Sequence, residues 1–262
     1  MLRPRIIPCL LIHQGGLVKT VGFKNPKYVG DPINAVKIFN EKEADELIVL
    51  DIDATVNNAE PDYSTIAKLA SECRMPLCYG GGIKTAEQAN KIISLGVEKV
   101  ALSSAAITHP KLVSEISNAI GRQSVVVVVD VKKKQSLFGK SEYKVYTHNG
   151  QQLHDKNLSL LLNELQEAGA GEIVINSIER DGQMKGYDLE LAQFIHNIVR
   201  VPLTILGGAG NHTDIQKLYQ TCGLVGAAAG SLFVFKGSFK AVLINYLNPS
   251  IRDELYNFAS IK

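Results

Sequence analysis

Short runs of apolar residues, many of them β-branched, recur along the chain and alternate with segments whose apolar residues follow helical spacing. Several runs are apolar at every position, which predicts strands that are covered on both faces. Repeated strand and helix units of this kind build parallel sheets. The eight expected strands are Arg5–Leu11, Glu46–Asp51, Pro76–Tyr79, Lys99–Ser103, Ser124–Asp130, Glu172–Asn176, Pro202–Leu206 and Leu224–Ala228.

A helical segment follows each run, and the first opens with Gly30-Asp31-Pro32, where proline suits the first turn. The expected helices are Asp31–Lys42, Tyr63–Cys73, Thr85–Ser94, Pro110–Ile120, Asn157–Ala168, Asp188–Ile198, Asn211–Tyr219 and Ser238–Tyr246. Eight strands with eight crossovers close into a barrel, whereas an open doubly wound sheet would need fewer strands and a reversal of strand order. We therefore predict an α/β fold, a single (β/α)8 TIM barrel that forms one domain over residues 1–262.

The two halves of the chain contain related segments. Pro76-Leu-Cys-Tyr-Gly-Gly-Gly in the first half corresponds to Pro202-Leu-Thr-Ile-Leu-Gly-Gly in the second. The next strands also correspond, since both lead into small and hydroxyl-bearing residues. This repetition predicts two half-barrels of four units each.

Composition narrows the classes of function. With 28 basic and 26 acidic residues the formal charge is +2, which gives no broad basic field and disfavours nucleic acid as a partner. Four cysteines without metal-ligand spacing predict buried thiols in a reducing cytoplasm, and no metal site. The basic start of residues 1–13 is interrupted by proline and too short for a signal peptide or a membrane span. No nucleotide-binding loop is evident, so we expect no cofactor.

Glycine pairs fall directly after two of the expected strands, where ligands of such barrels bind. Glycine lets backbone N–H groups approach an anion closely, and hydroxyl groups one strand further on can donate hydrogen bonds beside them. The first-half site comprises Gly81, Gly82, Ser103 and Ser104, and the second-half site comprises Gly207, Gly208, Gly230 and Ser231. One glycine pair alone could simply form a tight turn. Two matched sites instead predict a phosphorylated small-molecule ligand with an anionic group at each end.

Carboxylates end two of the apolar strands. Asp51 and Asp130 should face the mouth of the barrel, where a carboxylate can act as a general acid or base. Either could instead cap a helix or pair with a loop lysine. Asp181, followed by Gly182, comes after the sixth strand and could contact ligand or shape a turn. His13 lies just past the first strand, and we favour a loop role for it.

Four charged residues of alternating sign lie at the opposite ends of the strands. Arg5, Glu46, Lys99 and Glu172 stand at or next to the starts of strands one, two, four and six. A salt-bridged ring that closes the barrel bottom is the expected arrangement, and stability is the usual role of residues on that face.

Two long segments follow strands at the mouth. The basic run from Lys132 to Lys144 is typical of a solvated loop, although its position also allows capture of an anion. The segment His13–Gly30 contains several glycines and could act as a lid.

Taken together, these motifs resemble the cyclase subunit of imidazole glycerol phosphate synthase, and the likeness covers nearly the whole chain. The motifs are Arg5-Ile-Ile-Pro-Cys-Leu, Gly30-Asp-Pro, Asp45-Glu-Leu-Ile-Val-Leu-Asp, Tyr79-Gly-Gly-Gly-Ile, Ser177-Ile-Glu-Arg-Asp-Gly and Gly207-Gly-Ala-Gly. In that family the subunit is a duplicated half-barrel that receives ammonia from a glutaminase docked at the barrel bottom and closes an imidazole ring at the top. The resemblance therefore implies a heterodimer with a glutaminase subunit.

The resemblance also assigns roles to single residues. The four charged residues at the barrel bottom match the family's ammonia gate. Lys19 matches its lysine in the first loop, and Asp130 matches one of its two catalytic aspartates.

Five positions depart from the family pattern. Leu11 stands where the second catalytic aspartate belongs, so the carboxylate pair is lost. Ser103-Ser104 replaces Asn-Thr, Asn176 replaces a threonine, and Leu206 replaces a serine. A preserved gate beside an altered ligand site resembles the paralogous branch that is found with surface-polysaccharide genes, in which ammonia serves the synthesis of acetamidino sugars.

Three hypotheses follow. The chain could channel ammonia to an anionic acceptor for sugar amidination, it could be a genuine cyclase of histidine biosynthesis, or it could be a non-catalytic scaffold that binds a phosphosugar. The first is favoured, because Leu11 accompanies an intact gate.

Overall fold

Eight parallel strands close into a barrel in the computed structural model, which describes residues 4–135 and 141–260. Each strand pairs with the next, and the last pairs with the first. The barrel strands are β1 (Arg5–His13), β4 (Leu47–Asp51), β5 (Leu77–Gly80), β6 (Lys99–Leu102), β7 (Val125–Gln135), β10 (Glu172–Ser177), β11 (Leu203–Leu206) and β12 (Gly226–Ala229). The (β/α)8 barrel predicted from the apolar runs is confirmed.

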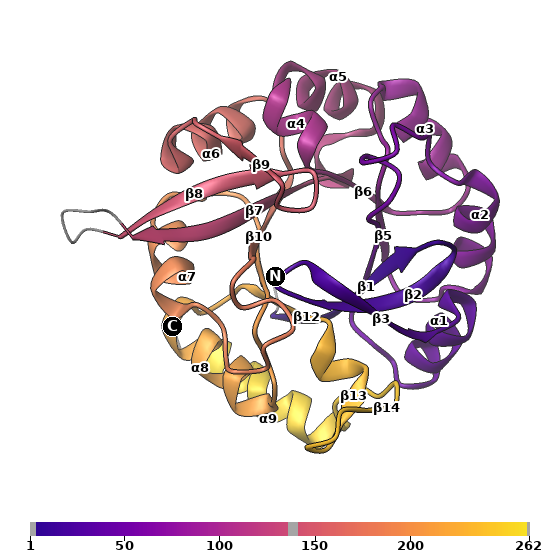
Figure 1. The fold of residues 1–262 in the computed structure, drawn as a ribbon, viewed down its shortest axis with the longest axis vertical. Coiled ribbons are helices and arrows are strands. Elements are labelled where there is room, and N and C mark those ends of the chain that lie inside the picture. Colours follow the sequence, from indigo (N-terminus) through magenta and orange to yellow (C-terminus); the bar gives the residue numbers. More distant parts are fainter. Residues whose placement is uncertain (1–3, 136–140, 261–262) are drawn as a thin grey trace.

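Helices surround the barrel on all sides (Figure 1). The eight that follow the strands are α1 (Pro32–Glu41), α2 (Tyr63–Glu72), α3 (Ala86–Ser94), α5 (Lys111–Ile120), α6 (Leu158–Glu167), α7 (Leu189–His196), α8 (His212–Cys222) and α9 (Pro249–Ser260). Shorter turns are α4 (Ser104–Thr108), η1 (Arg122–Ser124) and η2 (Ser231–Phe233). Side-chain caps fix several helix starts, among them Asp31 on α1 and the reciprocal Asn211–Asp214 box on α8.

Two antiparallel additions extend the barrel sheet, and a separate two-stranded sheet accompanies it. β2 (Gly16–Val21) and β3 (Lys24–Gly30) form a hairpin after β1, so the expected lid segment has regular structure. β8 (Ser141–Thr147) pairs with the long end of β7 and with β9 (Gln152–His154). The basic run predicted as a loop therefore lies largely in this hairpin, and its residues 136–140 fall outside the described part of the chain. β13 (Phe235–Lys236) pairs with β14 (Ala241–Val242).

The expected helix Ser238–Tyr246 is wrong. This range contains β14, and the turn before it places Gly237 and Lys240 in the left-handed region, at φ 73° and φ 49°. The last helix begins later, because Asn248 accepts the first helical N–H bonds and Pro249 occupies the first turn. Asn-Pro was the signal that sequence reasoning overlooked.

Two apolar layers stabilise the fold. Alternate strand residues such as Ile6 and Leu10 face the helices, while Ile7 and Cys9 face the barrel interior. The interior cluster also includes small side chains, among them Cys78, and it separates the two ends of the barrel. This arrangement leaves the strand starts and strand ends as two distinct polar sites.

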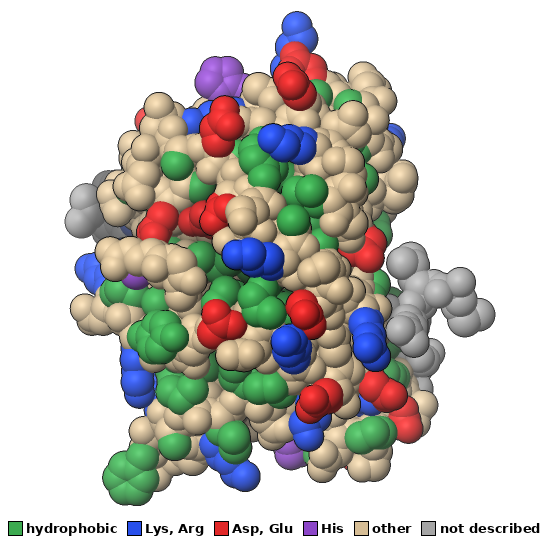
Figure 2. Space-filling model, turned by 90° about the vertical axis from the view of Figure 1, so that its right-hand side faces the viewer, with side chains coloured by type: hydrophobic (Ala, Val, Ile, Leu, Met, Phe, Trp, Pro, Cys, Tyr) green, Lys and Arg blue, Asp and Glu red, His purple; other side chains and the backbone are tan. Residues whose placement is uncertain are grey.

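One face of the molecule is of mixed charge. On the side seen in Figure 2, basic and acidic side chains are interspersed and do not gather by sign. Within the described ranges, the structure contains no helix with the length and apolar character needed to span a membrane.

Candidate functional site

A cavity of about 670 Å³ opens at the carboxyl ends of the barrel strands, and its size suits a small-molecule ligand. The hairpin β2–β3 crosses part of this mouth (Figure 1), and Lys19, Thr20 and Phe23 contribute to the wall. Strand-end residues supply most of the remaining lining, including Leu11, Asp51, Gly81, Gly82, Ser103, Ser104, Asp130, Asn176, Asp181, Leu206 and Gly230.

Asp130 and Asn176 form a polar pair in this wall. They are cross-strand neighbours on β7 and β10, and the Asn176 amide Nδ2 donates to Asp130 Oδ1 at 3.0 Å. Burial raises the pKa of Asp130 to about 7, although this hydrogen bond favours the ionised form. A carboxyl group that titrates near neutral pH can both accept and donate a proton in catalysis.

Two buried oxygens in the lining have no hydrogen-bond partner. They are Ser103 Oγ and Asn176 Oδ1. Buried polar atoms are nearly always satisfied in folded proteins, so each of these two atoms is available to a ligand or a bound water.

The first-half glycines lie in close contact with the loop that follows β4. A Cβ on Gly81, at φ +130°, would approach the Asp51 carbonyl oxygen to 2.6 Å, and one on Gly82, at φ +73°, would approach the Ala59 carbonyl to 2.8 Å. Only glycine fits both positions without displacement of the backbone. The structure thus brings these glycines into the same cavity wall as Ser103 and Ser104, as the sequence predicted.

Lys19 reaches into the barrel from β2. Its Nζ donates to the Cys9 carbonyl at 2.5 Å, and it would lie 2.5 Å from a Cβ on Gly230, so only glycine leaves room for this lysine. Burial lowers the pKa of Lys19, because desolvation disfavours its charged form. An anionic ligand in the cavity would compensate this desolvated ammonium.

The other two predicted carboxylates have structural partners. Asp51 lines the cavity, and its Oδ1 accepts the N–H groups of Asp53 and Ala54 at 2.9 and 3.1 Å, so it also shapes a turn. Asp181 accepts from the Thr20 hydroxyl at 2.7 Å and anchors the β2–β3 hairpin. Gly182 packs against the Thr20 carbonyl beside it. Burial raises the pKa of both aspartates.

The second-half anion site is brought together only in part. Gly230 lines the cavity, but Gly207, Gly208 and Ser231 are not among its lining residues. A Cβ on Gly208 would approach the Gly186 carbonyl to 2.2 Å, so these glycines serve close backbone packing as well. That these three residues bind an anion stays a prediction.

Sequence reasoning missed the β8–β9 turn. His148 and Asn149 both line the cavity and both adopt left-handed φ angles, 52° and 54°. The His148 N–H donates to Ser104 Oγ at 3.1 Å, and Asn149 Nδ2 donates to the Ile52 carbonyl at 2.8 Å. These bonds fix the turn across the mouth, and Asn-Gly at 149–150 was its available sequence signal. His13, for which we favoured a loop role, is instead the last residue of β1, and its Nδ1 pairs with Asp53 at 2.7 Å.

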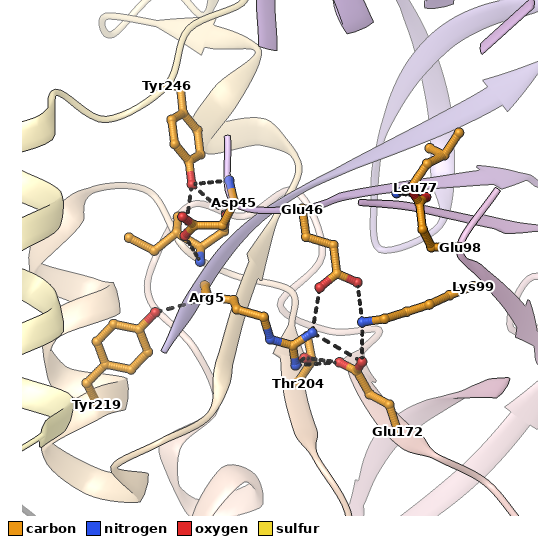
Figure 3. Close-up of polar contacts among 11 residues, drawn as sticks. Arg5, Asp45, Glu46, Leu77, Glu98, Lys99, Glu172, Thr204, Tyr219 and Tyr246 are labelled. Atoms are coloured by element: carbon orange, nitrogen blue, oxygen red, sulfur yellow. Dashed lines mark hydrogen bonds and ion pairs between the residues drawn. The ribbon is translucent and has the colours of Figure 1, made fainter. Parts of the chain in front are cut away.

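At the opposite end of the barrel, Arg5, Glu46, Lys99 and Glu172 form one closed ion-pair ring (Figure 3). The alternating contacts measure 2.5 Å for Arg5–Glu46, 2.7 Å for Glu46–Lys99, 2.9 Å for Lys99–Glu172 and 2.8 Å for Glu172–Arg5. Thr204, which was not predicted, donates to Glu172 at 2.7 Å. The predicted gathering of these four charges at the barrel bottom is what the structure contains.

Ion pairing within the ring compensates for the burial of its charges. Burial opposes ionisation of Glu172 and of both cations, but the opposite charges outweigh it. The pKa of Glu172 is therefore lowered, chiefly by Arg5, and the pKa values of Arg5 and Lys99 are raised, chiefly by Glu172. These shifts favour the charged forms of Arg5, Lys99 and Glu172, so the ring closes this end of the barrel with charged groups.

Within residues 4–135 and 141–260, no cluster of three or more His, Cys, Asp or Glu side chains could hold a metal ion. The fold and the site define a barrel of the TIM class with a ligand cavity at its mouth and a charged closure at its base.

Comparison with known proteins gives the family. The family model for histidine biosynthesis proteins matches residues 5–240. A Vibrio vulnificus protein with the provisional name imidazole glycerol phosphate synthase subunit hisF3 is 59% identical over 250 residues, 95% of each chain. A Leptospira borgpetersenii protein, provisionally subunit HisF of the same synthase, is 54% identical over 98% of this chain and 100% of its own. A Pseudomonas aeruginosa protein, provisionally hisF2, is 52% identical over 94% and 96%. The chain belongs to the family of HisF-like subunits of imidazole glycerol phosphate synthase.

Proposed function

We propose that this chain is the ammonia-receiving subunit of a glutamine-dependent synthase. In this proposal a glutaminase subunit docks at the barrel bottom, ammonia enters at the ion-pair ring, and a phosphorylated acceptor binds in the mouth cavity. The observation that carries the proposal is the placement of the ring and the cavity at opposite ends of the same strands. β10, for example, begins with Glu172 in the ring and bears Asn176 in the cavity wall.

The dimensions favour transfer along the barrel axis. Asn176 lies four residue steps along β10 from Glu172, which is about 13 Å at about 3.3 Å per residue. Between the two residues the barrel interior is filled by an apolar cluster that includes the small side chains of Cys9, Cys78 and Ala101. An apolar interior admits neutral ammonia and strongly disfavours the ammonium ion. The acceptor would thus meet a nucleophile that is already deprotonated.

The mouth supplies the groups that such a reaction requires. Ammonia that attacks an electrophilic carbon must lose a proton as the C–N bond forms, and Asp130, with its pKa raised to about 7, can accept it. Lys19 and the unpartnered oxygens of Ser103 and Asn176 can orient polar and anionic groups of the acceptor. Leu11 contributes only an apolar surface.

For the acceptor we propose a sugar that is amidinated during surface-polysaccharide synthesis. Leu11 at a carboxylate position of the family pattern supports this choice, because a ring closure that needs two proton-transfer groups lacks one of them here. Leu206 and Asn176, which also differ from the family pattern, lie in the same cavity wall as Leu11. The changed residues gather at the mouth, while all four charges of the ring are present.

The alternative is a genuine cyclase of histidine biosynthesis, and the raised pKa of Asp130 favours it. Purified chain supplied with the ribulosyl precursor of the pathway and an ammonium salt tests this alternative. Ring closure at an ordinary turnover rate would establish the cyclase and defeat sugar amidination. Leu11→Asp should add cyclase activity only if the altered wall still admits that precursor.

The docking step is tested with the cognate glutaminase. Co-purification and glutamine hydrolysis are measured with and without this chain. We expect a stable complex and stimulated hydrolysis, and we expect Asp130→Asn, which alters only the mouth, to preserve both. If neither a complex nor any stimulation is found with the wild-type chain, the proposal fails.

A further inference from the structure

The two carboxylates of the ion-pair ring are held unequally. Glu172 accepts four hydrogen bonds, with Arg5 Nη2 at 2.8 Å and Thr204 Oγ1 at 2.7 Å on Oε1, and Lys99 Nζ at 2.9 Å and Arg5 Nη1 at 3.2 Å on Oε2. Glu46 accepts two, from Arg5 Nη1 at 2.5 Å and Lys99 Nζ at 2.7 Å. Release of Glu46 therefore breaks half as many contacts as release of Glu172.

The backbone at Glu46 is also held by fewer contacts than the backbone at Glu172. Glu172 is the first residue of β10 and is paired in the barrel with Val126. Glu46 precedes β4, which begins at Leu47, and follows a turn in which Glu43 has φ 54°. Its main chain lies outside the paired ladder, so Glu46 can move without breaking strand pairing.

Asp45 holds the segment that contains Glu46 against β1, the strand that bears Arg5. Its carboxylate accepts the Ile6 N–H at 2.8 Å and the hydroxyl of Tyr256. Its own N–H donates to the Tyr246 hydroxyl at 3.3 Å, and that hydroxyl donates to the Ile6 carbonyl at 2.6 Å. The position of Glu46 in the ring is thus set by its neighbour.

Asp45 also borders the outside of the molecule. It lines a bottom-face cavity of about 510 Å³ together with Glu43, Arg74, Arg252 and Tyr256. Arg252 in this cavity has its Nε buried without a hydrogen-bond partner. A group that docks here would contact the residues that hold Asp45, one residue from the ring.

We infer that the ring opens by release of Glu46, while Glu172 stays bound to Arg5, Lys99 and Thr204, and that Asp45 is the positioning residue that keeps Glu46 in the closed ring. The meaning of this opening as an ammonia entrance rests on the proposed function. The opening itself is a property of the isolated chain.

The reactivity of the Cys78 thiol can report opening of the ring. It is fully buried in the interior cluster on β5, and burial raises its thiol pKa, with Glu46 next in effect, so it reacts only when the barrel opens. We propose to measure its modification by methyl methanethiosulfonate with mass spectrometry. Cys9, which lines the mouth cavity, reports entry from the other end, and buried Cys222 on α8 reports global unfolding.

Three variants separate the possibilities. Asp45→Asn should speed Cys78 modification about tenfold, because it weakens charged hydrogen bonds that hold the segment. Thr204→Val removes one donor from Glu172 and should change the rate less than about twofold. Glu98→Gln is the matched control, since Glu98 holds the start of β5 through the Leu77 N–H at 2.7 Å without touching the ring, and it should leave Cys78 unchanged. Cys9 and Cys222 should keep wild-type rates.

The remaining outcomes overturn the inference. Faster Cys78 modification in Thr204→Val but not in Asp45→Asn would mean that Glu172 is released instead. Equal acceleration in both, or in neither, would mean that the ring has no preferred side. If Asp45→Asn also speeds Cys222, Tyr256→Phe removes one hydroxyl from the same carboxylate and is judged by the same comparison. A missing glutaminase complex would defeat the proposed function and leave these rates as they are.

Discussion

Asp130 gives the strongest quantitative test of the mouth. Burial raises the pKa of this carboxyl group from an ordinary 3.8 to about 7 in the folded protein. Between these two values the native state binds one more proton than the unfolded state. Stability therefore falls as the pH rises from about 4 to about 7, and the loss is complete above the folded pKa.

The magnitude follows from the two pKa values. At about 1.4 kcal/mol per tenfold change, the difference corresponds to about 4 kcal/mol when the group is fully desolvated. The side chain is partly accessible from the cavity, so screening lowers the expected effect to about 2–3 kcal/mol. Asp130→Asn keeps an oxygen that can accept from Asn176 and removes the ionisation. Part of this effect is already lost between about pH 4 and pH 5, so relative to wild type Asp130→Asn should gain about 1 kcal/mol of stability between pH 5 and pH 8.

Urea unfolding of both proteins at intervals from pH 5 to pH 8 measures this difference directly. Asp155→Asn, at an exposed carboxylate, controls for the loss of one negative charge. Ionisations shared by all three proteins cancel in the comparison. Parallel pH curves for wild type and Asp130→Asn would refute the reasoning, because they would show that Asp130 titrates alike in the folded and unfolded chains.

Three further perturbations have defined outcomes. Arg5→Met leaves Glu172 and Glu46 with one shared cation and should destabilise the fold by about 2–4 kcal/mol in urea unfolding; a loss below about 0.5 kcal/mol would contradict a coupled ring. Gly81→Ala, whose Cβ would meet the Asp51 carbonyl at 2.6 Å, should cost about 2 kcal/mol or more, and an unchanged melting temperature would show that the loop yields freely. Tyr187→Phe removes a buried hydroxyl that donates to the Ala228 carbonyl at 3.0 Å, and it should lower the free energy of unfolding by about 1 kcal/mol. A variant more stable than wild type would contradict a stabilising role of this hydrogen bond.

The barrel was predictable because its signal is local. Each strand is a short apolar run that ends near a glycine, a carboxylate or a hydroxyl group, and strand boundaries inferred from those runs agree with the structure to within a few residues. The ion-pair ring was predictable for a related reason, since strand starts in a closed parallel barrel meet at one end. Arg5 and Glu172, 167 residues apart, are brought together by closure alone.

Two of the missed features, the place of Thr204 in the ring and that of His148 at the mouth, depend on contacts between segments distant in the sequence. Thr204 joins the ring because β11 lies beside β10, and a buried threonine on a strand looks like any other core position in sequence. His148 reaches the mouth only because β7 continues past the barrel into a hairpin. The helix expected over residues 238–246 failed because two left-handed turn residues, Gly237 and Lys240, favour a hairpin over helical periodicity.

The central claim, that the charged end of the barrel faces a glutaminase, is tested most directly by a hydrogen-exchange footprint of the complex with the cognate glutaminase. We expect slower amide exchange at the bottom face, in residues 42–46 and 96–99, and unchanged exchange in the β8–β9 turn around His148. Protection confined to the mouth, with the bottom face exchanging as in the free chain, would contradict the account.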